Sequence, residues 1–330
     1  MLTPRENLIE TIRGGNPDRY VNQFEALALQ WCNPLDTKHS RPEYGKGPVQ
    51  NAWGVYFEWP KGTPGEFPLH DPEHILIKDI GRWREYVKMP ETVFPEEVWA
   101  EIVEAANKVD RSQQFVTACM WPGLFENCHH MMSMEECMIN LYEEPEFMHE
   151  LITFVTEYEL NLSKAVVEHI HPDAVYRHDD WGTQISSFMS NEMFREFYLD
   201  PTKKIYQFWR DNGVEIVIHH SDSYGENLIP EMIEAGIDVW QGALSTNNLP
   251  RIAKEYKGKL TIMGGINSGI VDRPDWSAEK IHNEVNRILD WTDSKYFIPN
   301  CTQGGAGSTF KGVYDEVSKA IEIYNRTKYI

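Results

Sequence analysis

Six segments of the chain share one hydrophobic pattern: an apolar, β-type run ends abruptly in polar residues, and a helix-like stretch follows. These segments are 114–121, 173–180, 215–222, 237–242, 260–267 and 295–301. A strand buried on both faces has a nearly continuous apolar sequence, and alternation of such strands with helices is typical of parallel βαβ units. The pattern therefore predicts an α/β fold with a parallel sheet.

The stretches around these strands predict helices and one further strand. At the start of the chain, Thr3 is a candidate N-cap, Pro4 occupies the first helical position, and Glu6 closes a capping box. Helices are expected over 4–13, 95–109, 124–141, 145–169, 191–211 with a break at Asp200-Pro201, 225–235, 247–256, 277–290 and 310–327. A first strand is expected at about 20–29. No linker divides the chain, so we expect a single domain over 1–330, folded as a (β/α)8 TIM barrel.

Residues from about 33 to 90 lose this regular pattern. Pro, Gly and aromatic residues dominate there, as in 44–48, 51–60 and 62–65. The short apolar pieces alternate well enough for a small hairpin. Long irregular excursions of this kind are more often functional lids than connectors. We therefore predict an N-terminal insertion that caps the mouth of the barrel.

Charge and composition exclude several classes of function. Lys plus Arg is 31 and Asp plus Glu is 51, which gives a net charge of −20. This charge opposes binding to nucleic acid or to an anionic membrane, and it disfavours a substrate with many carboxylates. No apolar run is long enough to span a membrane, and the first residues lack the apolar stretch of a signal peptide. The 5 cysteines have no paired spacing, which favours reduced thiols and a cytoplasmic protein.

Titratable residues gather at the ends of the second and third expected segments. In a (β/α)8 barrel the active site is built at the carboxyl ends of the strands. The candidate catalytic residues are therefore His178, Asp179, Asp180 and His219. Adjacent carboxylates raise each other's pKa, which would keep a proton available near neutral pH. In the alternative reading, one aspartate caps or orients and the other is solvated.

A second set of strand-end residues has the chemistry of zinc ligands. His220, Asp222 and Cys301 offer an imidazole, a carboxylate and a thiolate, all of which bind zinc. His220 and Asp222 are two positions apart, so both side chains can point the same way. The set predicts a zinc site with one open position. The alternative is a hydrogen-bonded polar cluster beside a buried, inert thiol.

Aromatic residues near the strand ends suit a flat aromatic substrate, by stacking, or a methylated ammonium group, by cation–π attraction. Together with two polar residues at the ends of later strands they form the predicted substrate site. Its members are Trp121, Tyr176, Trp181, Tyr224, Trp240, Gln241 and Asn267.

The same residues carry a family resemblance. The segments that carry it are 53–55, 178–184, 194–201, 220–222, 234–238, 264–267 and Asn300-Cys301. They resemble the uroporphyrinogen decarboxylase superfamily, which implies a (β/α)8 barrel. One branch of that superfamily decarboxylates uroporphyrinogen, and another comprises methyltransferases that work with a corrinoid protein and often hold zinc. The chain lacks the Arg-rich N-terminal motif of the decarboxylases. It also has His220-Ser221-Asp222 where the methyltransferases have His-x-Cys.

The resemblance implies a methyltransferase that moves a methyl group from a small methylated substrate, foremost an aryl methyl ether, to the cobalt of a corrinoid. The expected partners are a corrinoid protein and, for the chain itself, a possible second copy in a homo-oligomer. Three alternatives remain: a uroporphyrinogen decarboxylase-like decarboxylase, a second-step transferase from methylcorrinoid to a thiol or folate, and a non-catalytic binder of a corrinoid or tetrapyrrole.

Overall fold

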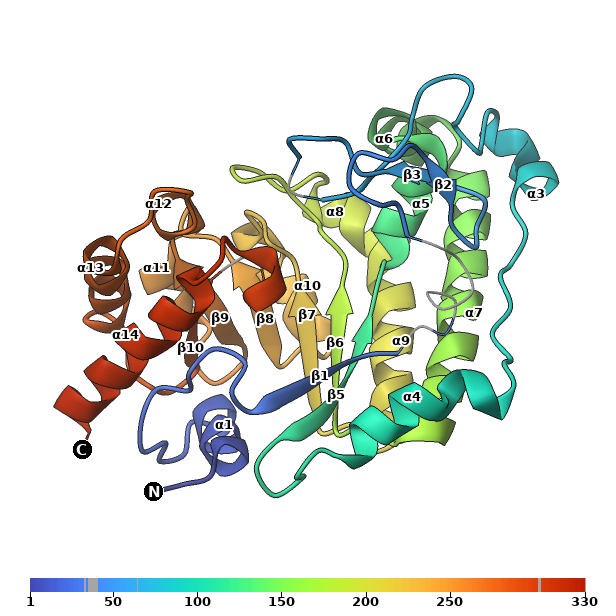
Figure 1. Ribbon diagram of the computed structural model, residues 1–330. Helices are drawn as coiled ribbons and strands as arrows, with labels where there is room; N and C mark the ends of the chain where they lie inside the picture. The colour runs from blue at the N-terminus through green and yellow to red at the C-terminus, as the bar shows by residue number, and fades with distance from the viewer. Residues whose placement is uncertain (33, 35–40, 64, 302–303, 330) are drawn as a thin grey trace.

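A parallel sheet forms the centre of the computed structural model, which describes residues 1–32, 34, 41–63, 65–301 and 304–329 (Figure 1). Its strand order is β1-β5-β6-β7-β8-β9-β10, which is also the order along the chain. The strands are β1 (Leu27–Trp31), β5 (Phe115–Met120), β6 (Ala174–His178), β7 (Ile216–His220), β8 (Val239–Ala243), β9 (Thr261–Ile266) and β10 (Phe297–Cys301). The α/β class and the six patterned strands are confirmed, while the first strand lies later than the expected 20–29.

The sheet differs from the predicted barrel at its seam. The described residues form seven strands in place of eight, and β1 and β10 do not pair with each other. The side chain of Gln23 occupies this seam. Its Oε1 accepts hydrogen bonds from the backbone N–H of Cys301 and from Nδ2 of Asn300, while its Nε2 donates to Ser318 Oγ. A buried amide side chain thus takes hydrogen bonds that a neighbouring strand would otherwise take.

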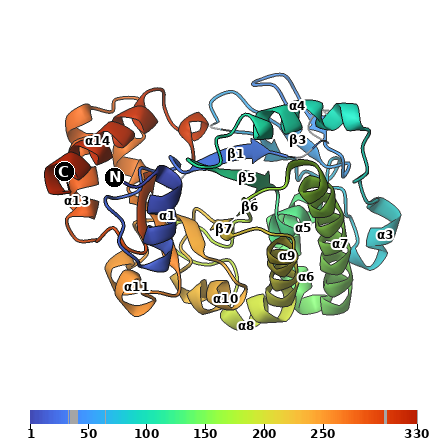
Figure 2. The ribbon, with the colours of Figure 1, turned by 90° about the horizontal axis from the view of Figure 1, so that it is seen from below.

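Helices cover the outer side of the sheet, and Figure 2 shows α7, α9, α10, α11 and α13 following one another around it. The longer helices are α1 (Pro4–Arg13), α4 (Glu96–Asn107), α5 (Leu124–Met132), α6 (Met134–Glu143), α7 (Pro145–Ile170), α9 (Asp200–Asp211), α10 (Ile229–Glu234), α11 (Leu249–Glu255), α13 (Ala278–Leu289) and α14 (Val313–Lys328). Shorter helical pieces are η1 (Ile80–Arg82), α3 (Trp83–Tyr86), α8 (Asn191–Phe194), η2 (Arg195–Leu199), η3 (Glu226–Leu228), α12 (Ser268–Val271) and η4 (Ala306–Ser308).

Two local features change the expected helices. The single helix expected over 124–141 divides at Ser133, which has a φ of 92° and caps the second half by accepting the N–H of Glu136. The break expected at Asp200-Pro201 is instead a π-helical turn, Arg195–Leu199, directly before α9. Proline has no N–H to donate, so the chain widens ahead of Pro201 without ending the helix.

The alternation of side chains along each strand separates two apolar clusters. One cluster fills the concave, inner side and includes Tyr176, Ile218 and Ile298. The other lies between the sheet and the helices and includes the neighbouring Val175 and Val217. Successive side chains of a strand point to opposite faces. The same alternation decides which polar residues at the strand ends reach the inner side.

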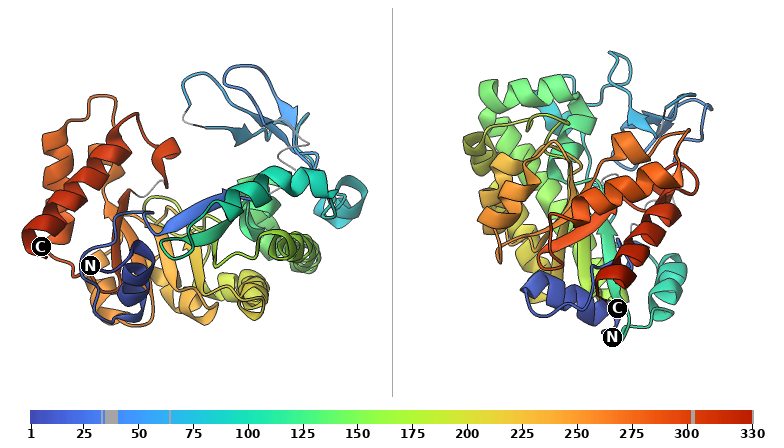
Figure 3. Two further views of the ribbon diagram at one scale, coloured as in Figure 1. Left: turned by 60° about the horizontal axis from the view of Figure 1, so that its bottom comes forward. Right: turned by 90° about the vertical axis from the view of Figure 1, so that its left-hand side faces the viewer.

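The irregular N-terminal segment contains a small antiparallel sheet of β2 (Val49–Gln50), β3 (Tyr56–Glu58) and β4 (Phe67–Pro68). Figures 1 and 3 show it at the end of the molecule away from both termini. It is joined to α5, since Phe57 packs edge-on against His130 with 5.3 Å between ring centroids. The expected hairpin is therefore present, while its action as a lid stays a prediction. Residues 33, 35–40 and 64 of this segment lie outside the described residues.

Across the described residues, none of the helices combines the length and the apolar character that a membrane crossing requires.

Candidate active site

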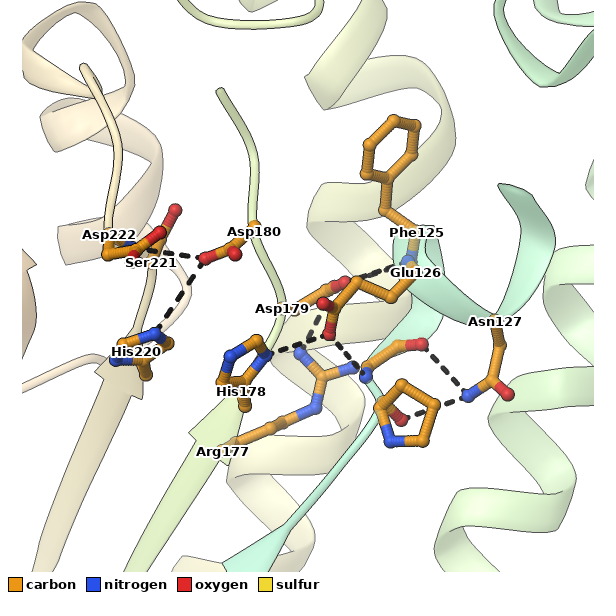
Figure 4. A network of polar contacts seen from close by, with 12 residues as sticks. Phe125, Glu126, Asn127, Arg177, His178, Asp179, Asp180, His220, Ser221 and Asp222 are labelled. Carbon is orange, nitrogen blue, oxygen red and sulfur yellow. Dashed lines mark hydrogen bonds and ion pairs between the residues drawn. The ribbon is translucent and has the colours of Figure 1, made fainter. Parts of the chain in front are cut away.

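A cavity of about 230 Å³ lies on the inner side of the sheet. Aromatic rings form much of its wall, and two imidazoles reach it from the ends of β6 and β7. These six residues are Phe24, Trp31, Trp121, Tyr176, His178 and His220. The polar groups around the two imidazoles form the candidate active site (Figure 4).

His178, the last residue of β6, is held by a carboxylate from α5. Its Nδ1 lies 2.9 Å from Oε2 of Glu126, which is buried in the first turn of that helix. A carboxylate in this position fixes the orientation of the ring and leaves Nε2 pointing away from Glu126. Glu126 was absent from the sequence-based candidates. Its signal was local: it stands three residues after Gly123, at the N3 position of a capping box.

His220, at the end of β7, is held by a chain of buried polar side chains. Tyr176 donates its hydroxyl hydrogen to Oε1 of Gln241 at 2.6 Å, and His220 Nδ1 contacts the same oxygen. Gln241 in turn donates from Nε2 to Asn300, which donates to Gln23 at the seam. Nδ1 of His220 also lies 2.8 Å from the Tyr176 hydroxyl, so this polar chain engages Nδ1 and leaves Nε2 directed toward Asp180.

Two aspartates complete the cluster. Oδ1 of Asp180 lies 3.9 Å from Nε2 of His220 and accepts the backbone N–H of Asp222 at 3.0 Å. The rings of His178 and His220 stack with 4.2 Å between their centroids. Two imidazoles and the carboxylates of Asp180, Asp222 and Glu126 therefore share one small region.

Burial and charge shift the pKa values of this cluster. Burial, reinforced by His178, lowers the pKa of His220 to about 4. Burial also disfavours the His178 imidazolium, but Glu126 and Asp180 outweigh that effect and raise the pKa of His178 to about 10. Desolvation raises the pKa of Glu126 and of Asp222 to about 7, and the negative charge of Asp180 adds to both shifts. His220 is therefore neutral near pH 7.

Asp179 faces the helices and not the cavity. Its carboxylate accepts the N–H groups of Phe125 and Glu126 at 3.3 and 3.0 Å, and Nε1 of Trp181 at 3.1 Å. These amides belong to the first turn of α5, where helical N–H groups have no partner within the helix. Gly123 allows this approach, because an added Cβ would lie 2.3 Å from Cβ of Asp179. Asp179 thus holds α5, and with it Glu126, in place.

Arg177 and His219 lie on the same outer side. Arg177 is fully buried and pairs with both carboxylate oxygens of Glu159 on α7, at 2.5 and 2.9 Å. His219 bonds to the hydroxyl of Tyr206 at 2.7 Å and stacks on Trp181. The geometry therefore assigns His219, like Asp179, a supporting position behind the sheet and brings only His178 and Asp180 of the predicted catalytic set to the inner side.

The predicted zinc ligands are also separated by the sheet. Asn300 faces inward, so the next residue, Cys301, faces outward and packs in the cluster between sheet and helices. Burial raises the pKa of the Cys301 thiol to about 12. Within the described residues, the group whose ligand atoms converge is His178, Asp180 and His220, all within 4.8 Å of one another. His220 is common to both sets; Asp222 lies beside this group and Cys301 does not.

The seven predicted substrate residues divide in the same way. Trp121 and Tyr176 line the cavity, and Gln241 reaches it through its bond to Tyr176. Trp181 and Trp240 are fully buried in the outer cluster. The remaining two lie away from the cavity wall: the Tyr224 hydroxyl bonds to Glu226, and Asn267 precedes the short helix α12.

A parallel α/β sheet with an acid and imidazole cluster at its carboxyl-terminal edge defines a barrel-type enzyme. The chain belongs to the uroporphyrinogen decarboxylase (URO-D) family, whose model matches residues 52–309. Among solved structures, a methyltransferase from Methanosarcina mazei has a similar fold, with a TM-score of 0.64 and 15% sequence identity over 100% of both chains. A search of the curated proteins found no match.

Proposed function

We propose that this protein is a methyltransferase that takes a methyl group from a small methylated substrate, an aryl methyl ether in the first place, and passes it to the cobalt of a corrinoid carried by a partner protein. Membership of the URO-D family and the similarity in fold to an archaeal methyltransferase support the reaction class. The nature of the cavity supports the substrate class.

The observation that carries the proposal is the pairing of aromatic walls with a titratable end. Trp31, Trp121, Tyr176 and Phe24 surround the space beside the imidazoles. A flat aryl ring can stack between such walls, with its ether oxygen at the polar end. The volume of about 230 Å³ lies below the roughly 300–1,000 Å³ of typical drug-sized ligand sites, which favours a small substrate.

The same cavity argues against porphyrinogen decarboxylation. A substrate with eight carboxylates requires a cationic lining, whereas Arg41 is the single Lys or Arg among the described residues that line this space. Arg41 is already paired with Glu66. The cluster at the end of the cavity adds negative charge, and the chain as a whole carries −20. A polycarboxylate would therefore meet repulsion where it needs attraction.

Transfer of the methyl group requires help at the oxygen that loses it. As the carbon moves to cobalt(I), the carbon–oxygen bond breaks and its electron pair stays on the oxygen. A proton or a cation at His178, Asp180 and His220 would keep that oxygen from leaving as a bare anion. Glu126 and Gln241 would hold the two rings in place while this happens. The chain needs no nucleophile of its own in this scheme.

The second-step alternative, methyl transfer to a thiol, is less well supported. Activation of a thiol is favoured by a thiolate-rich metal site. Here Cys301 faces away from the imidazoles, and the converging group contains no sulfur. The first-step reaction therefore agrees better with the geometry.

The direct test mixes the protein with a corrinoid protein reduced to cobalt(I) and an aryl methyl ether labelled in its methyl group. We expect methylcobalt absorbance to appear together with the free phenol. His178→Gln should abolish transfer, and His149→Gln, an exposed histidine on α7, should retain it. Absence of methylcobalt with ethers, amines and thiols alike would overturn the proposal. Porphyrinogen turnover would then indicate a decarboxylase, and tight corrinoid binding without transfer a non-catalytic binder.

A further inference from the structure

The predicted zinc ligands do not all lie on the same face of the sheet. His220 reaches the inner side at the end of β7, while the Cys301 thiol packs among apolar side chains on the outer side of β10. Side chains that point to opposite faces of one sheet cannot bind the same ion without breaking the strand. A metal ion at this end of the sheet therefore needs a different set of ligands.

Two neighbouring strands supply such a set. His178 and His220 are paired in the register of β6 and β7, and Asp180 follows β6 on the same side. One ligand atom from each of the three lies within 4.8 Å of the others. In a tetrahedral zinc site with bonds of 2.0–2.2 Å, ligand atoms are about 3.4 Å apart, so movements of roughly 1 Å would close the set around an ion.

The groups behind the two imidazoles already have the arrangement that metal sites use. Glu126 engages Nδ1 of His178, and Gln241 engages Nδ1 of His220. Metal-binding histidines almost always donate a hydrogen bond from their second ring N–H to a carboxylate or another acceptor. This bond fixes the tautomer and aims the other ring nitrogen at the ion. Both rings therefore direct Nε2 toward the same point, and His178, whose imidazole is protonated near pH 7, would release its Nε2 proton when the ion binds.

Charge favours a cation at the same point. The Asp222 carboxyl group interacts with that of Asp180, and Glu126 adds a third carboxylate around the two rings. The buried Arg177 cannot serve as their counter-ion, because it lies behind the sheet and is paired with Glu159. A divalent ion would relieve the repulsion among these carboxylates.

We propose that His178, Asp180 and His220 bind one divalent first-row metal ion, with zinc as the leading candidate, and that Asp222 and an open position face the cavity. Two imidazole nitrogens and a carboxylate oxygen, without sulfur, make this a harder site than a thiolate site. Such a site suits an ether or phenolate oxygen. The role of the ion at the ether or phenolate oxygen rests on the proposed methyl transfer, whereas the binding of the ion does not.

The test measures metal binding without substrate or corrinoid. The whole protein is freed of metal with a chelator and titrated with Co2+, whose absorption reports its ligands. We expect one ion per chain, visible d–d bands and no thiolate-to-cobalt charge-transfer band. Asp180→Asn and His220→Gln should each weaken binding at least about a hundredfold, while Cys301→Ala should leave it unchanged. Circular dichroism of each variant checks the fold, and X-ray absorption of the wild type reads the ligands without any substitution.

Several outcomes would overturn this site. They are a sulfur ligand in the absorption data, loss of binding in Cys301→Ala alone, full binding in folded His220→Gln, or no ion bound by the wild type. Methyl transfer that persists in chelated protein would overturn the metal and leave the proposed function intact. A bound ion in a protein that transfers no methyl group would support the metal site and overturn the proposed function.

Discussion

The imidazole rings of His178 and His220 stack with 25° between their planes, across the pair of strands β6 and β7. Each ring is held from behind by a different element, His178 by Glu126 of α5 and His220 by Gln241 of β8. Two rings this close cannot both be charged at small cost. The cluster therefore functions as one unit, and changes to the groups behind the rings should affect it as strongly as changes to the rings themselves.

Glu126→Gln tests the support of His178. The substitution keeps the shape of the side chain and removes its charge. We expect the rate of methyl transfer to fall about 10–100-fold, which is the usual cost of losing a group that orients a functional histidine. Steady-state kinetics measure the rate, and thermal unfolding should show little change. Glu135→Gln, an exposed glutamate on α6, is the matched control and should retain full activity.

Arg177→Met tests the buried ion pair behind the site. Arg177 is fully buried, and its loss would leave the carboxylates of Glu159 and Asp179, which lie 2.5 and 3.5 Å from its guanidinium nitrogens, without a counter-charge. We expect the free energy of unfolding to fall by about 3–5 kcal/mol in urea titrations. The double variant Arg177→Met/Glu159→Met should recover the part of this loss that comes from Glu159, whereas the buried carboxylate of Asp179 still lacks the guanidinium. A single variant as stable as the wild type would contradict this account of the pair.

The strands of the sheet were predictable because they are buried on both faces. The apolar runs 114–121, 173–180 and 215–222 contain β5, β6 and β7, with polar residues at the predicted ends. The seam was not predictable, since Gln23 closes it through a side chain and leaves no periodic signal. The first strand was displaced for a different reason: most side chains of β1 are only partly buried, so it lacks the continuous apolar run of the other strands.

The strand ends that form the candidate site could be predicted from the sequence, but the side chains that converge there could not. The sequence brought together His178, Asp180 and His220 with residues that face the other way, among them Asp179 and Cys301. Side chains alternate between the two faces along a strand, so neighbouring residues lie on opposite faces. Which of two neighbours faces inward depends on the register of each strand. Glu126 could not be assigned from the strand ends at all, because it reaches the site from a helix.

A half-buried histidine outside the His178–His220 cluster should make stability depend on pH. Burial, with the nearby His70 adding to it and Asp180 opposing it, lowers the pKa of His129 to about 4 from 6.5. The unfolded chain therefore takes up this proton first as the pH falls. The free energy of unfolding should decrease between pH 6.5 and pH 4, by at most about 3 kcal/mol from this group, and His129 should add nothing above that window.

Urea titrations at a series of pH values measure this effect. His129→Gln should be less sensitive to pH than the wild type between pH 6.5 and pH 4. His149→Gln, which replaces an exposed histidine on α7, is the matched control and should follow the wild-type curve. Equal slopes in all three proteins would show that His129 is not held neutral by the fold.

The adjacent residues His219 and His220 provide the sharpest test of how the sheet divides the site. His220 faces the cavity, whereas His219 bonds to Tyr206 of α9 and stacks on Trp181 behind the sheet. His220→Gln should lower methyl transfer more than about a hundredfold with little loss of stability, since the change removes an imidazole of the candidate site. His219→Gln should lower the free energy of unfolding by about 1–3 kcal/mol, because the buried hydroxyl of Tyr206 loses its partner. Activity per folded molecule in that variant should stay within about threefold of the wild type.

The two variants are compared by kinetics at equal folded concentration and by urea unfolding. A reversal, in which His219→Gln is inactive although folded and His220→Gln is active, would show that the functional side of the sheet has been assigned to the wrong face.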